Sequence, residues 1–142
     1  MIGFLIAVLS GILMSLQGVF NTEVTKNSSM WSAAGFVHLT ALLVCVAAWF
    51  VTERHGISGL WTVRPRYFLL GGVIGAFITY TVVASMSRMG PAKAVMFIVT
   101  AQIISAYLIE VFGMFGVEKQ PLTASKVIGM LVAIAGVVIF KW

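Results

Sequence analysis

The chain has 142 residues, of which 61% are hydrophobic and only 9% are charged. Since about a quarter of the residues in an ordinary soluble domain are charged, this composition excludes a soluble protein and indicates a lipid environment. The nine Lys and Arg residues outnumber the four acidic residues. They fall singly or in pairs between apolar runs, which favours loops beside lipid headgroups over a nucleic-acid-binding face.

Five segments satisfy the rule that roughly 20 mostly apolar residues cross the hydrocarbon core of a bilayer. The sequence therefore predicts an all-α integral membrane fold in a single domain, residues 1–142. The predicted helices cover residues 2–20, 31–50, 67–87, 92–115 and 123–140. The fifth is free of charge only over 127–140, so Lys126 is expected to extend its ammonium group to the headgroups.

The predicted connections contain residues that commonly cap, end or start helices. Asn27-Ser28-Ser29 is expected to cap the second helix, and Gly90-Pro91 is expected to join the third and fourth helices as an antiparallel hairpin. Residues 53–66 form the only sizeable predicted loop. The single cysteine, Cys45, lies within an apolar run and is expected to be a small buried hydrophobic residue.

Five crossings place the two termini on opposite sides of the membrane, with nearly equal positive charge on each. The N-terminal side holds five basic residues and the other side four, and a difference of one hardly favours either orientation. Two interpretations stay open: a weak preference for an inside N-terminus, or dual topology, in which copies inserted both ways pair antiparallel. Because five helices are half of a common ten-helix transporter, an antiparallel homodimer would complete that fold, as would a paralogue of opposite topology.

Small residues recur every three or four positions on two predicted helices. They indicate close helix packing in lipid, without saying whether the neighbouring helix belongs to the same chain. The residues concerned are Gly71, Gly75, Gly129, Ala133 and Gly136.

Uncharged polar residues lie at membrane depth on the first and fourth predicted helices. Gln17 and Asn21 are four residues apart on one helical face, and Gln102 and Ser105 lie in the middle of the fourth helix. An amide facing lipid is costly, so these side chains are expected to point to protein or to a wet cavity. Both alternatives, lining of a solute cavity and interhelical hydrogen bonding, stay open.

Two ionisable residues lie within the predicted helices. His38 is either a neutral hydrogen-bonded imidazole or a cavity residue, and Glu110 is either an interfacial carboxylate or a candidate for proton coupling. No spacing indicates a nucleophile with its base, a metal site or a bound cofactor, so an enzyme is not predicted.

With these residues in view, the chain resembles the drug/metabolite transporter superfamily, and most closely its YdcZ-like family of short five-helix proteins. The resemblance depends on an ordered set of segments that covers nearly the whole chain: Gln17-Gly18-Val19-Phe20-Asn21, Gly71-Gly72-Val73-Ile74-Gly75, Gly90-Pro91-Ala92, Ala101-Gln102-Ile103-Ile104, Leu108-Ile109-Glu110, Ile128-Gly129 and Ala135-Gly136-Val137. It implies a bacterial inner-membrane exporter that works as a dimer mimicking the ten-helix members. The related small multidrug resistance family has an essential Glu in its first helix. This chain has Gln17 in comparable surroundings, so proton–cation exchange through such a Glu is not carried over.

The expected function is export of a small polar or amphipathic metabolite or drug by alternating access in an antiparallel dual-topology dimer. The expected partners are a second copy or paralogue, the lipid bilayer and the small-molecule substrate. A dual-topology channel and a non-transporting subunit of a larger membrane complex are the alternatives.

Overall fold

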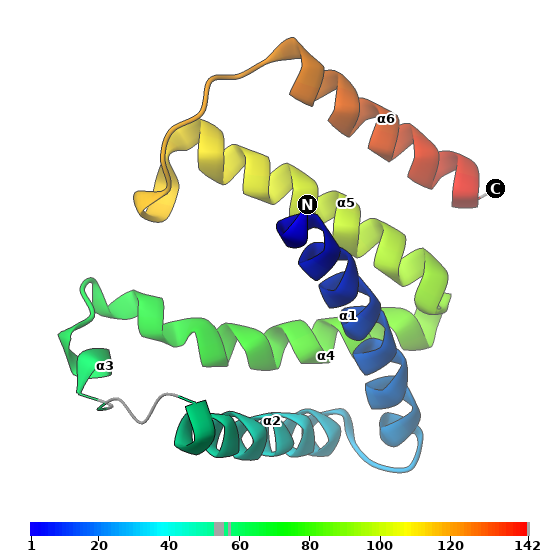
Figure 1. The fold of residues 1–142 in the computed structure, drawn as a ribbon. Helices are drawn as coiled ribbons and strands as arrows, with labels where there is room; N and C mark the ends of the chain where they lie inside the picture. The colour runs from blue at the N-terminus through cyan, green and yellow to red at the C-terminus, as the bar shows by residue number, and fades with distance from the viewer. Residues whose placement is uncertain (53–55, 57, 142) are drawn as a thin grey trace. The chain divides into compact units, whose positions relative to one another are not determined.

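The computed structural model describes residues 1–52, 56 and 58–141, and every regular element among them is helical (Figure 1). Arg54, one of the five basic residues counted on the N-terminal side, and Glu53, at the start of the predicted loop, lie outside the described residues. The elements in chain order are α1 (Ile2–Lys26), α2 (Met30–Thr52), α3 (Gly59–Thr62), the 3-10 helix η1 (Arg66–Leu70), α4 (Gly71–Met89), α5 (Pro91–Phe112), the 3-10 helix η2 (Met114–Gly116) and α6 (Ala124–Lys141).

Four helical segments in the described part of the chain are long and apolar enough to cross a membrane. They are α1, α2, η1 together with α4, and α5, with mean hydropathies from 1.9 to 2.1. Most of their large apolar side chains are exposed, including Leu9, Leu43 and Phe77. A helix that exposes apolar residues on most of its sides requires lipid around it. The protein is therefore a multi-pass membrane protein.

The fifth predicted crossing corresponds to α6, which is shorter than the other four. Its apolar part, Ala124–Phe140, has fewer residues than α5, and it lies at the lower limit of about 17 residues that can span the hydrocarbon core. The all-helical fold is confirmed, whereas the crossing by α6 stays a prediction.

The first helix is longer than predicted and continues past Asn21 to Lys26. The hydroxyl groups of Thr22 and Thr25 donate to the carbonyls of Gly18 and Asn21 one turn earlier, so these polar residues are accommodated within the helix. The helix ends before Ser28 and Ser29, and Ser29 Oγ accepts a hydrogen bond from Ser32 N at 3.1 Å. This is the predicted side-chain cap of α2.

The fourth predicted helix ends earlier than expected, at Phe112 instead of residue 115. Gly113 has φ +62°, and its N–H donates to the carbonyls of Ile109 and Glu110. A left-handed glycine that satisfies the last carbonyls is a common helix terminator. At the other end, Pro91 is the first residue of α5 and follows Gly90 at φ +83°, so Gly90-Pro91 joins α4 directly to α5.

The chain divides into two compact units, Met1–Ser87 and Arg88–Trp142, which are described separately; a single domain stays a prediction. In the first unit, α2 packs on α4 through Trp31, whose ring stacks on Tyr80 with centroids 4.7 Å apart. On α1, Gly18 lies against Met86 of α4: a Cβ added to this glycine would lie 2.5 Å from the Met86 Cε atom. Met86 and Val83 are among the few buried side chains, so this close contact is the packed part of α4.

In the second unit, α5 and α6 lie side by side along their lengths (Figure 1). The hydroxyl of Tyr107, a buried residue on α5, accepts a hydrogen bond of 3.0 Å from the N–H of Thr123, which immediately precedes α6. The carbonyl of Glu110 accepts a further hydrogen bond from Gln120 N at 3.0 Å. The connection between the helices is therefore bound back to the end of α5.

Candidate functional site

An open groove of about 540 Å³ lies between α1 and α2 in the first unit. This volume is within the range of roughly 300–1,000 Å³ that is typical of small-molecule sites. The lining residues are Leu13, Leu16, Gln17, Phe20 and Asn21 on α1 and Val37, Thr40, Ala41, Val44 and Cys45 on α2. The groove therefore has mainly apolar walls with a few uncharged polar groups.

Gln17 and Asn21, the two amides predicted to share a face of α1, both line this groove. Asn21 is 7% exposed, whereas Gln17 is exposed. Within the described chain, neither side-chain amide makes a hydrogen bond. The structure thus places both amides beside open space, although a role in binding a solute stays a prediction.

None of the five groove residues on α2 was identified from the sequence as a site residue, including the two with a hydroxyl or thiol group, Thr40 and Cys45. Thr40 Oγ1 donates to the backbone carbonyls of Phe36 and Val37 at 3.1 and 2.9 Å, so the hydroxyl can offer the groove only an acceptor. Cys45 is exposed, and the prediction that it is buried is therefore wrong. Because α2 is apolar on all sides, no periodicity in its sequence indicates which face meets α1.

His38 faces α4 and does not line the groove. Its Nε2 lies 3.4 Å from Thr79 Oγ1, with the donor set by the tautomer, and its Cε1 would lie 3.5 Å from a Cβ added to Gly75. The imidazole is half-buried between two helices. Its hydrogen-bond partner is a side-chain hydroxyl on the neighbouring helix α4.

The other predicted cavity residues, Gln102 and Ser105, are exposed on α5 in the second unit. Their part in a cavity stays a prediction. The predicted packing glycines Gly71, Gly129 and Gly136 have open space around the position of a Cβ, and Ala133 is half-buried. Close packing against a further helix stays a prediction for these four positions.

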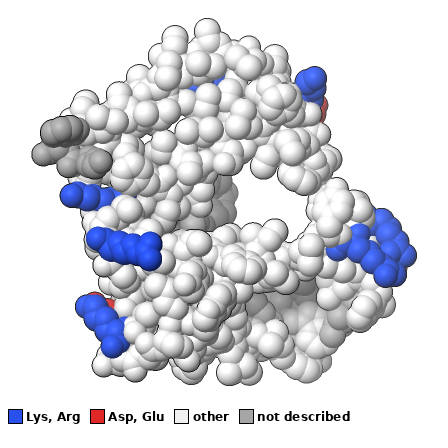
Figure 2. Space-filling model, turned by 180° about the vertical axis from the view of Figure 1, so that it is seen from behind, with Lys and Arg blue, Asp and Glu red and all other residues white. Residues whose placement is uncertain are grey.

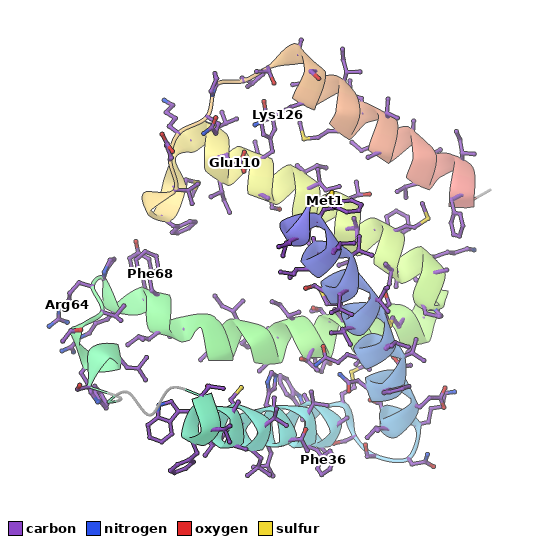
Figure 3. All side chains as sticks on the ribbon, in the orientation of Figure 1. Met1, Phe36, Arg64, Phe68, Glu110 and Lys126 are labelled. Atoms are coloured by element: carbon purple, nitrogen blue, oxygen red, sulfur yellow. The ribbon has the colours of Figure 1, made fainter. Side chains whose placement is uncertain are left out.

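Glu110 points from α5 to Lys126 on α6 (Figure 3). The Glu110 Oε2 and Lys126 Nζ atoms are 3.5 Å apart, and both side chains are less than half exposed, at 43% and 46%. The same ammonium lies 5.2 Å from the ring centroid of Tyr107. A paired, half-exposed carboxylate favours the interfacial interpretation of Glu110, because the neighbouring ammonium compensates its charge.

The Glu110–Lys126 pair is expected to contribute modestly to the association of α5 with α6. A double-mutant cycle with Glu110→Gln and Lys126→Met should give a coupling of about 0.2–1 kcal/mol, since the groups are partly exposed. The measurement is reversible unfolding in mixed detergent micelles. Glu23→Gln, which disrupts the exposed Glu23–Lys26 pair within α1, is the matched control. Zero coupling, together with complete loss of transport in Glu110→Gln, would instead favour proton coupling through Glu110.

Charged side chains are sparse on the surface. In the face shown in Figure 2, Lys and Arg atoms form small separate groups, and the rest of the visible described surface is almost entirely uncharged. Arg64 lies just before η1 and Arg66 is its first residue, and Arg88 and Lys93 lie on either side of the junction of α4 with α5; all four are exposed. These positions agree with basic residues at the ends of membrane-crossing helices.

Comparison with known families gives one match along nearly the whole chain. Residues 2–139 match the family model described as "Putative inner membrane exporter, YdcZ". No curated protein and no solved structure matches the chain.

Proposed function

Because this chain belongs to the YdcZ family of inner membrane exporters, we propose that it exports small polar or amphipathic solutes by alternating access. The observation that carries the proposal is the open groove of about 540 Å³ between α1 and α2, with Gln17 and Asn21 on its wall. Side-chain amides that lie on a membrane-crossing helix and make no hydrogen bond within the protein are available to bind a passing solute.

The proposed exporter is an antiparallel dimer with dual topology. Five helices would supply one half of a ten-helix transporter, and the second copy would supply the other half in inverted orientation. The nearly equal distribution of nine basic residues supports insertion in both orientations. The open surroundings of Gly129 and Gly136 on α6 leave room for a helix of a second copy.

The proposal is tested by solute flux in proteoliposomes made from the purified chain. A screen of neutral, zwitterionic, cationic and anionic solutes is expected to find saturable flux of at least one class. Gln17→Leu should lower that flux about tenfold, the equivalent of ~1.4 kcal/mol in binding. Ser15→Ala is the matched control, because the Ser15 hydroxyl donates to Gly11 O on the same helix and lies outside the groove.

Three results would overturn exporter function. Flux of no solute would remove the proposal. Flux that does not saturate would indicate a channel. Stable co-purification with a different chain, with no flux and no self-association, would indicate a subunit of a larger complex.

A further inference from the structure

We infer that the groove between α1 and α2 binds a neutral amphiphile, with its polar head on Gln17 and Asn21 and its apolar tail along the α2 wall. This inference rests on the proposed function, because it names the class of solute that the same groove would accept. It is carried by the hydrogen-bonding state of the amides, by their order along the groove and by the absence of charge on the described groove walls.

The first observation is a polar group with unused hydrogen-bonding capacity on the groove wall. Asn21 is only 7% exposed and lines the groove, and its side-chain amide, which makes no hydrogen bond to any described residue, stays accessible from the groove. A ligand in the groove can therefore add a directed hydrogen bond to this amide. Each amide presents a donor and an acceptor, which match the amide or hydroxyl group of a ligand.

The second observation is the order of polar and apolar residues along the groove. Asn21 is five positions before Lys26 at the charged end of α1, so it lies about 8 Å from that end at ~1.5 Å per residue. Leu13 is thirteen positions away, at about 20 Å. Helix α2 begins four residues after α1 ends, so on α2 Val37 is nearer to that end and Cys45 is further from it. The polar head site is therefore near the headgroup level, and the apolar walls reach the middle of the bilayer.

The third observation concerns charge. None of the ten residues that line the groove in the described chain is an Asp, Glu, Lys, Arg or His. The nearest charge along α1 on the headgroup side of Asn21 is Glu23, which is paired with Lys26 at 2.6 Å. An ionised head would lose its hydration in the groove without gaining a counter-charge. The groove therefore favours a neutral head and disfavours a phosphate-headed lipid as the occupant.

The test measures binding without any solute gradient. The full chain in detergent micelles is labelled with octanamide that carries a diazirine on its tail, and the cross-links are mapped by mass spectrometry. Labels are expected on groove residues of α1 and α2. Unmodified octanamide should compete at least tenfold better than octanoate or heptylammonium, which have the same seven-carbon tail but a charged head. Asn21→Leu and Gln17→Leu should each weaken labelling about tenfold, and Ser15→Ala should not.

The head-group series needs no substitution, so the test remains decisive even where Asn21→Leu does not fold. Equal competition by the three heads, or labels spread over all helices, would overturn the inference. A co-purified phospholipid that occupies the groove and resists octanamide would also overturn it, in favour of a lipid site. Selective binding of octanamide without flux would support the groove assignment and count against export, so failures of the two proposals are distinguishable.

Discussion

Replacing Gly18 with leucine is expected to destabilise the first unit by about 1–3 kcal/mol, the usual effect of overpacking a filled interior. A Cβ at Gly18 would lie 2.5 Å from Met86 Cε and 2.8 Å from Met86 Sδ. Methionine is flexible, so an alanine at this position can be accommodated by a rotation of the Met86 tip. Leucine adds three further carbons at a site where Met86 is only 4% exposed and has little room to move.

The cause is isolated by a compensating substitution. Met86→Ala alone should destabilise the protein by leaving a cavity, whereas the double variant with Gly18→Leu should be more stable than the sum of the single effects predicts. Gly11→Ala on the same helix is the control, because no atom lies within 4 Å of its added Cβ. It should be neutral or stabilising by up to about 1 kcal/mol. Additive effects of Gly18→Leu and Met86→Ala would contradict the α1–α4 contact.

The sequence predicted the long apolar helices well because their lengths are dictated by the bilayer, but it predicted their ends less well. The predicted first helix ends at residue 20, just before a run of polar residues, yet α1 continues to Lys26. The length of a hydrocarbon span and the length of a helix are different quantities, since a helix can extend into the headgroup region. The early end of α5 depends on the left-handed Gly113, which apolar composition alone does not reveal.

One wall of the groove could be predicted from the sequence, and the other could not. The spacing of Gln17 and Asn21 places both on one face of a helix, because residues four apart are neighbours on the helix surface. Thr40 and Cys45, on the opposite wall, depend on how α2 is rotated against α1. An evenly apolar helix carries no periodic signal for that rotation. Likewise, the contact of His38 with Thr79 joins residues 41 positions apart and follows only from tertiary packing.

Shifting the balance of basic residues is expected to force the chain into one orientation. On five crossings, the N-terminal side has five Lys and Arg residues and the opposite side four. Arg64→Ala and Arg66→Ala together with Lys119→Ala change this from five against four to two against four, and should favour an outside N-terminus. Arg88→Ala with Lys93→Ala changes it to five against two, and should favour an inside N-terminus. All five side chains are exposed, so these substitutions should hardly alter stability.

The expected shift is large because each basic residue near the membrane surface is worth about 1 kcal/mol, so two change the orientation ratio about 30-fold. The measurement uses reporters that are active on only one side, attached in turn to each terminus. Wild-type chains should give signals on both sides, and the two charge variants should give opposite single signals. Signals that place both termini on the same side would show that α6 does not cross.

The same two variants test the dimer by complementation. If transport requires an antiparallel pair, each oriented variant alone lacks copies of the opposite orientation and should lose most of its flux. Co-expression of the two variants supplies both halves of the inverted assembly and should restore flux, although neither variant regains a basic residue. Full flux from either variant alone would contradict an obligatory antiparallel dimer. Because Gln17 and Asn21 are unchanged in both variants, a loss that co-expression restores must come from orientation and not from the groove.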